Sequence, residues 1–154
     1  MRGCGFLLAL VAMGLFATTL LAGNGLANTV VAFKIEGDAV QTPLNGLVGA
    51  PGRGRRIVID RQTGNCLICH SIRSIDEPFQ GVIGPALNDV GRRLSPGQIR
   101  LRMIDQRRIN PTTIMPPYYR IRGLRDVDPV YRGRPVLDAQ QIEDVVAFLT
   151  TLRE

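Results

Sequence analysis

Apolar residues recur at helical spacing in the C-terminal part of the chain. They form one continuous face: Ile142, Val145, Val146, Leu149 and Leu152. Asp138 and Gln141 stand in front of this run with the spacing of a capping box, in which each residue satisfies a backbone N–H of the other. The pattern predicts a last helix that begins after Asp138 and packs its apolar face on the core.

A second helix is expected from Pro96 to about Ile109. Ser95 and Gln98 form another capping box, and proline is favoured at the first helical position. The apolar residues of this segment again form a stripe: Ile99, Leu101, Met103 and Ile104. The pair Asn110-Pro111 would end the helix.

A third helix is expected from Pro51 to about Arg61, with proline in its first turn. Its apolar body at positions 57–59 is β-branched and therefore a weak helix former. Proline and glycine predict loops over residues 76–87 and 111–117. Since the chain has 154 residues and no internal repeat, the pattern predicts a single all-α domain over residues 51–154.

The first 50 residues depart from this helical pattern. Residues 1–27 combine a positive start, an apolar stretch and a small-residue site, which predicts a cleaved export signal; a retained membrane anchor is the alternative. Residues 28–50 form an N-terminal arm with strand-like alternation at three apolar positions: Val31, Phe33 and Ile35. This arm could pack on its own domain, remain loose or cover a partner.

Charge and cysteine content narrow the function. The formal net charge is +6, and nearly all of the positive charge is arginine, since Lys34 is the sole lysine. The arginines are scattered and the aromatic residues are few, which argues against nucleic acid as a partner. We interpret the charge as favouring solubility and a docking surface. Of the three cysteines, Cys4 lies in the expected signal, so the mature chain keeps Cys66 and Cys69.

The candidate chemistry lies in the run Cys66-Leu67-Ile68-Cys69-His70. Two cysteines separated by two residues and followed by histidine form the pattern for covalent attachment of haem c. Cys66 and Cys69 would bond to the haem vinyl groups, and His70 would bind the iron. A structural zinc site is excluded because it needs four protein ligands, whereas this run offers three. A thioredoxin-like dithiol is excluded because it needs a βαβ pattern, which the sequence does not show. We therefore predict one covalently bound haem c and, with the export signal, a periplasmic protein that no membrane holds after cleavage.

The second axial ligand is expected to be Met115, in a loop stiffened by the two prolines that follow it. Methionine is a common partner of histidine in cytochromes c and raises the reduction potential. Met103 is the rival, but it lies on the helical apolar stripe, where methionine usually fills the core. A small-gas sensor with an open iron site would require that Met115 does not bind.

A metal-bound histidine usually donates its other ring N–H to a carbonyl or carboxylate. Proline lacks a backbone N–H, but its carbonyl can accept a hydrogen bond. Pro85, in the loop after the haem motif, is therefore a candidate partner of His70; the alternative is a plain turn.

Several motifs of this chain resemble the SoxX family, the small c-type cytochromes of bacterial sulfur oxidation. Besides the haem motif, the resemblance rests on four stretches: Gly84-Pro85, Asn110-Pro111, Met115-Pro116-Pro117-Tyr118-Tyr119-Arg120 and the run from Gln141 to Leu149. It covers about residues 30–154. We therefore expect an all-α fold, a small class I-like cytochrome c domain with an N-terminal extension.

The resemblance also implies a partner and a reaction. The chain would form a heterodimer with a SoxA-like cytochrome, in an L-cysteine S-thiosulfotransferase that oxidatively joins thiosulfate to a cysteine of the carrier SoxYZ. The turnover site would lie on the partner, and this chain would pass electrons to a diffusible cytochrome. The alternative is a free-standing diffusible cytochrome c of a respiratory chain. The arm and the Tyr118–Pro135 loop, rich in Arg and Tyr, are expected at the partner interface.

Overall fold

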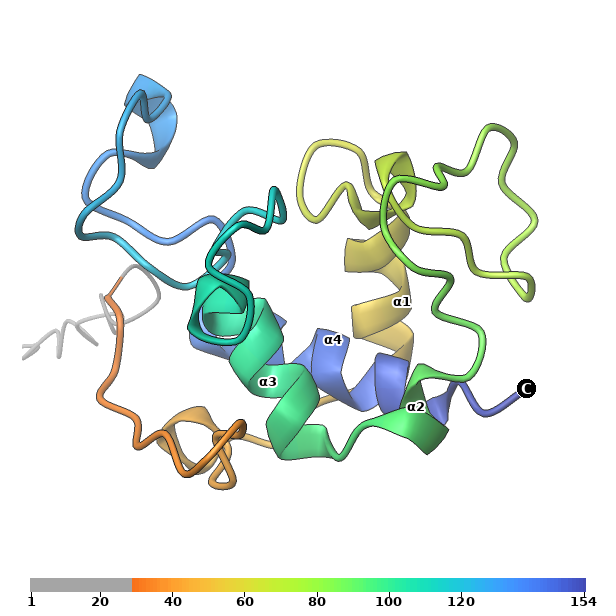
Figure 1. The fold of residues 1–154 in the computed structure, drawn as a ribbon, viewed down its shortest axis with the longest axis horizontal. Helices are drawn as coiled ribbons and strands as arrows, with labels where there is room; N and C mark the ends of the chain where they lie inside the picture. Colours follow the sequence, from red (N-terminus) through yellow and green to blue (C-terminus); the bar gives the residue numbers. More distant parts are fainter. Residues whose placement is uncertain (1–28) are drawn as a thin grey trace, which may run out of the picture.

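The computed structural model describes residues 29–154, and the expected export signal lies outside them. This part of the chain consists of four α-helices and short 3₁₀ turns joined by loops (Figure 1). The helices are α1 (Pro51–Ile59), α2 (Val90–Arg93), α3 (Pro96–Asp105) and α4 (Ala139–Thr151). The 3₁₀ turns are Leu44–Gly46, Cys66–Ile68, Gln106–Arg108 and Pro129–Tyr131. None of the helices in residues 29–154 has both the length and the apolarity that a membrane span requires.

The three helices predicted from the sequence are confirmed as α1, α3 and α4. Both predicted capping boxes form: Ser95 and Gln98 cap α3, and Asp138 and Gln141 cap α4. The chain after α3 continues as a 3₁₀ turn through Arg108, which explains the expected end near Ile109. The short helix α2 was not predicted, because its four residues are too few to show a helical period.

Two local predictions about backbone conformation are wrong. The alternation in the arm does not produce a strand, because no neighbouring strand exists in residues 29–154, where the only β-pairing is an isolated bridge between Glu36 and Ala39. The sequence also suggests that the haem motif lies on a short helical turn that continues to about Arg73, but the turn ends at Ile68. The chain then becomes a loop, as expected for residues 76–87.

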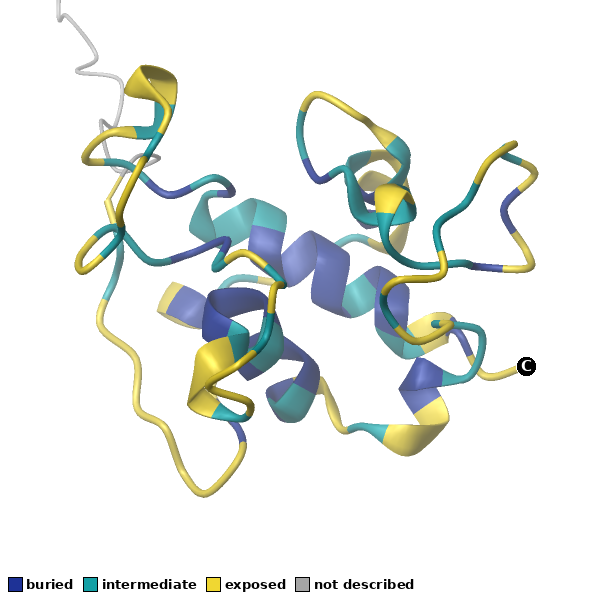
Figure 2. Ribbon diagram, turned by 45° about the horizontal axis from the view of Figure 1, so that its top comes forward, coloured by how far each residue is buried: buried dark blue, intermediate teal, exposed yellow. Residues whose placement is uncertain are grey.

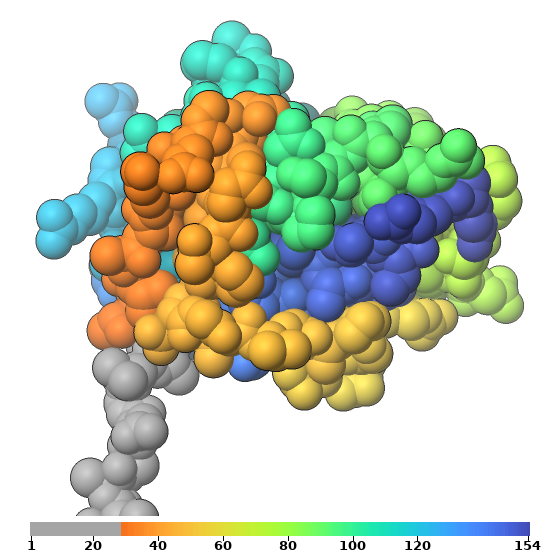
Figure 3. All heavy atoms as spheres, turned by 90° about the horizontal axis from the view of Figure 1, so that it is seen from below, coloured from red at the N-terminus to blue at the C-terminus, as the bar shows by residue number. Residues whose placement is uncertain are grey.

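The second half of the N-terminal arm packs on its own domain, whereas residues 32–38 are exposed. Ala39, Val40 and Leu44 are each only 1% exposed, and the latter two belong to the main apolar cluster. The backbone N–H of Val40 donates to the Gly97 carbonyl at 3.0 Å, and that of Leu44 donates to a Glu143 carboxylate oxygen at 2.9 Å. Figure 3 shows the arm and the segment after it lying along α4 and beside the segment that contains α3.

A buried ion pair fastens the arm between α3 and α4. The Arg100 guanidinium donates to both oxygens of Glu143, at 2.7 and 2.8 Å, and a third nitrogen donates to the Val40 carbonyl at 2.7 Å. Both charged side chains are almost fully buried, 4% and 3% exposed. The two charges are thus tied to the arm backbone as well as to each other, so the arm is part of the core structure.

The core lies where α4 crosses α1 and packs on α3. Figure 2 shows that buried residues occupy most of α4 and one side of α3, while the connecting loops are largely exposed. At the crossing, Gly54 of α1 sits against the backbone of α4. A Cβ at Gly54 would overlap the Asp144 carbonyl and lie 2.8 Å from the Phe148 Cβ.

We predict that Gly54→Ala destabilises the protein, because the added methyl group must push the two helices apart. Overpacking of this kind costs about 1–3 kcal/mol. Gly52→Ala is the matched control in the same helix, because a Cβ there meets no atom within 4 Å. Its expected effect is a gain of up to about 1 kcal/mol from helix propensity. Urea unfolding followed by circular dichroism measures both, and equal stabilities of the two variants would contradict the crossing geometry.

Candidate haem-binding site

A cavity of about 810 Å³ opens between α1, α3 and the loops that follow the haem motif. Its size falls in the range of cofactor sites, about 300–1,000 Å³. All five residues of the predicted site line this one cavity, among them the four expected to hold haem or iron: Cys66, Cys69, His70 and Met115. The fifth is Pro85. Residues far apart in the sequence are thus brought together at the place where the predicted chemistry requires them.

The two cysteines are presented by a single 3₁₀ turn. The N–H groups of Cys69 and His70 both donate to the Cys66 carbonyl, at 3.2 and 3.0 Å. Asn65 enters the turn with a left-handed backbone (φ 50°), a conformation that asparagine tolerates better than most residues. Burial raises the pKa of the Cys66 thiol to about 11, although the neighbouring Tyr118 hydroxyl opposes this shift. The thiol is therefore neutral at pH 7 in this fold.

The imidazole of His70 is held by the loop that follows it. Its Nδ1 lies 2.7 Å from the Pro85 carbonyl oxygen, the contact expected from the sequence. Gly84 makes this approach possible, since a Cβ there would lie 2.6 Å from Nδ1 and overlap the ring carbon Cε1. A hydrogen bond at Nδ1 fixes the ring and leaves Nε2 as the nitrogen that can bind a metal. The residues therefore fit a haem whose iron approaches from the cavity side.

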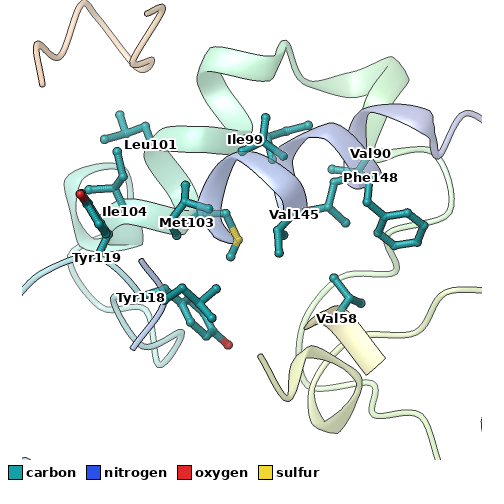
Figure 4. Packing of buried hydrophobic residues seen from close by; sticks show 14 of the residues in the cluster. Val58, Val90, Ile99, Leu101, Met103, Ile104, Tyr118, Tyr119, Val145 and Phe148 are labelled. Carbon is teal, nitrogen blue, oxygen red and sulfur yellow. The ribbon is translucent and has the colours of Figure 1, made fainter. Parts of the chain in front are cut away.

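Both candidate methionines line the cavity. Met115 is half-buried, and its N–H donates to the Thr113 hydroxyl at 3.1 Å within the proline-bounded loop. Met103 lies in α3, is 3% exposed and belongs to the apolar cluster, as its place on the helical stripe predicted (Figure 4). Helical spacing could not predict that Met103 also lines the cavity. The spacing identifies which face of the helix is buried, but not which residues or cavity lie against that face.

Tyr118 connects the methionine loop to the cysteine turn. Its hydroxyl donates to the Gly64 carbonyl at 2.9 Å, and its N–H donates to the Met103 carbonyl at 3.2 Å. It lines the cavity and is 8% exposed, and burial raises its pKa well above the usual value, so the phenol stays neutral. The sequence did not identify Tyr118 as part of the site, because nothing in its local sequence shows which distant carbonyl its hydroxyl will bond to.

The expectation that Tyr118 and Tyr119 lie at a partner interface is wrong. Tyr119 is 1% exposed, and its hydroxyl accepts from the Val31 N–H at 2.9 Å and donates to the Thr29 carbonyl at 3.2 Å. Both tyrosines are therefore used inside this chain, where they hold the methionine loop and the start of the arm. The exposed part of the 118–135 loop is formed mainly by its later residues, and it carries three arginines, Arg122, Arg125 and Arg132, beside the exposed Asp126 and Asp128.

Comparison with solved structures gives an informative relationship. No family model and no curated protein sequence matches the chain. Among solved structures, it is similar to a chain in the crystal structure of SoxXA from P. pantotrophus, with 36% sequence identity and a TM-score of 0.74. The match covers 79% of this chain and 95% of that chain. An identity of 36% over nearly the whole of the other chain indicates common ancestry and not only a similar fold. The sequence motifs that line the cavity resemble the same family. The chain belongs to the SoxX family of c-type cytochromes.

Proposed function

We propose that this chain is the electron-transfer subunit of a periplasmic SoxXA-type complex. In this proposal Cys66 and Cys69 hold one haem c covalently, and His70 and Met115 are its axial ligands. The observation that carries the proposal is that these four side chains line one cavity, in a chain 36% identical to a chain of SoxXA. The domain would be a small class I-like cytochrome c with its signal removed after residue 27.

The bound haem would supply a reversible one-electron couple. The residues of the chain would set its properties. The Pro85 carbonyl accepts from the His70 ring and raises the basicity of this ligand. A thioether from Met115 would favour the ferrous state and thereby raise the reduction potential. Tyr118, through its bond to the Gly64 carbonyl, keeps the methionine loop against the cysteine turn.

The reaction of the complex would place the turnover site on the partner. Joining thiosulfate to a carrier cysteine through a new sulfur–sulfur bond is an oxidation that releases an electron pair. Cys66 and Cys69 would both be bonded to haem, so within residues 29–154 no cysteine would remain as a nucleophile. This chain would accept the electrons from a SoxA-like partner and deliver them to a diffusible cytochrome.

A free-standing diffusible carrier remains the second candidate, and one observation favours it. The arm and the Tyr118–Pro135 loop were expected at a partner interface, but the second half of the arm and the loop residues Tyr118 and Tyr119 pack inside this chain. They therefore do not require a partner. The exposed arginines of the 118–135 loop are the feature that still fits a docking surface, since arginine is enriched at interfaces.

Co-expression with a SoxA-like cytochrome tests this function. We expect a stable heterodimer in size-exclusion chromatography, thiosulfate conjugation to SoxYZ that depends on this chain, and a denatured mass that exceeds the apoprotein by one haem. Simultaneous replacement of Arg122, Arg125 and Arg132 by glutamine should weaken the heterodimer. A monomer whose omission leaves conjugation unchanged would favour the free-standing carrier, whereas pigment extracted by acidic acetone would refute the covalent haem.

A further inference from the structure

The α3 wall of the cavity carries two polar side chains that iron ligation does not use. Four residues of α3 and the turn after it line the cavity at helical spacing: Ile99, Arg102, Met103 and Gln106. Ile99 and Met103 belong to the apolar cluster. Arg102 and Gln106 instead bring a cation and an amide to the same wall, one helical turn apart, so their presence needs its own explanation.

Arg102 has no acidic partner within this chain. Its Nη1 donates to the Gln98 carbonyl of its own helix at 3.0 Å, and no carboxylate in residues 29–154 forms an ion pair with it. By contrast, Arg100 and Arg120, two other arginines that are not exposed, each pair with Asp or Glu. A half-buried cation beside an apolar cavity gains free energy when an anion enters that cavity.

Gln106 adds a second polar group at the same place. Its Oε1 atom is buried and has no hydrogen-bond partner in the described part of the chain. Such an atom costs free energy unless a partner is supplied. A half-turn of the terminal amide exchanges its oxygen for its NH₂ group, which then donates to an anion held by Arg102.

The chemistry of haem identifies that anion. The vinyl groups that bond to cysteine and the two propionate groups lie on opposite edges of the porphyrin. The cysteine turn fixes the vinyl edge, and α3 lies across the molecule from that turn (Figure 1), while both line the same cavity. The other arginines that line the cavity are less suitable: Arg93 is paired with Asp89 at 2.8 Å, and Arg61 is exposed on the segment leading to Cys66.

We propose that Arg102 and Gln106 form the binding site for a haem propionate carboxylate. This inference rests on the proposed haem function and adds the residues that hold the edge of the cofactor opposite the thioether bonds. The Arg102 guanidinium can donate two parallel N–H bonds to one carboxylate, the strongest arrangement of this kind. Its positive charge at the wall of the cavity would also favour the ferrous state.

The direct test is redox-difference infrared spectroscopy of holoprotein whose haem propionate carboxyls carry carbon-13. We expect the label-sensitive carboxylate bands to shift in Arg102→Gln and in Gln106→Leu. They should stay in place in Arg107→Gln, the matched control, because Arg107 is exposed in the same turn as Gln106 but does not line the cavity. Unchanged bands in both cavity variants would overturn the proposal.

The reduction potential provides a second readout. Arg102→Gln should lower it, Arg102→Lys should lower it less because the charge is kept, and Arg107→Gln should leave it unchanged. If Arg102→Gln does not fold, Arg102→Lys and Gln106→Leu carry the infrared test. A parent protein with no covalent haem would refute the proposed function, whereas a normal haem spectrum with unchanged labelled bands in the variants would refute this site alone.

Discussion

Met115→Ala should open the haem iron to carbon monoxide and lower the reduction potential. The physical reason is that a thioether ligand favours ferrous over ferric iron, so its removal favours the ferric state and leaves a vacant axial position. The measurements are the visible spectrum of the reduced protein with and without carbon monoxide, and a potentiometric titration. The haem should remain attached, because Cys66 and Cys69 are unchanged and still present their thiols from one turn.

Met103→Ala is the matched variant, since Met103 lines the same cavity but belongs to the apolar cluster. Removing a buried methionine side chain costs about 2–5 kcal/mol of stability. The spectrum and the response to carbon monoxide should stay those of the parent. The opposite result, with carbon monoxide binding in Met103→Ala only, would show that α3 supplies the ligand.

Glu143→Gln should strongly destabilise the protein, although it replaces only one carboxylate oxygen by an NH₂ group. It leaves the Arg100 guanidinium buried without its anion, and breaking a buried ion pair on one side costs about 3–5 kcal/mol. It also weakens the acceptor for the Leu44 N–H, so the N-terminal arm should loosen together with the core. Since the chain contains no tryptophan, urea unfolding is best followed by circular dichroism, with hydrogen exchange at residues 39–47 reporting on the arm.

The double variant Arg100→Met with Glu143→Leu should be more stable than Glu143→Gln alone, because it removes both buried charges together. Glu36→Gln is the surface control. Its partner Lys34 is 83% exposed, and exposed ion pairs contribute little to stability. A loss of stability in Glu36→Gln as large as that in Glu143→Gln would show that burial is not the cause.

The sequence predicted best those elements that depend on interactions between residues close together in the chain. The capping boxes at Ser95 and Asp138 depend on residues three positions apart, and both form as expected. The turn at Cys66 was also expected from the five-residue motif, although it ends earlier than predicted. The Pro85 contact spans 15 residues, but it was still predictable, because the ligand chemistry of histidine calls for an acceptor and the nearby loop offers one.

The predictions that failed concern groups whose partners are distant in the sequence. The alternating residues of the arm suggested a strand, but a strand needs a neighbour, and the described chain provides none. Tyr118 and Tyr119 suggested an interface, but their hydroxyls bond to groups 54 to 90 residues away. The sequence around an aromatic residue in a loop does not show whether that residue contacts a partner protein or its own chain.

The amino-acid sequence by itself determined where the three longer helices begin, which residues form a haem-attachment motif and which family the motifs resemble. These depend on residue chemistry over a few positions, where the backbone leaves few choices. Only the tertiary structure decided that Val40 and Leu44 of the arm belong to the core, that Met103 reaches the cavity and that Arg102 lies there without an acidic partner. The reason is that burial and pairing arise when helices cross and distant segments exclude water together, as in the bond between Leu44 and Glu143 across 99 residues.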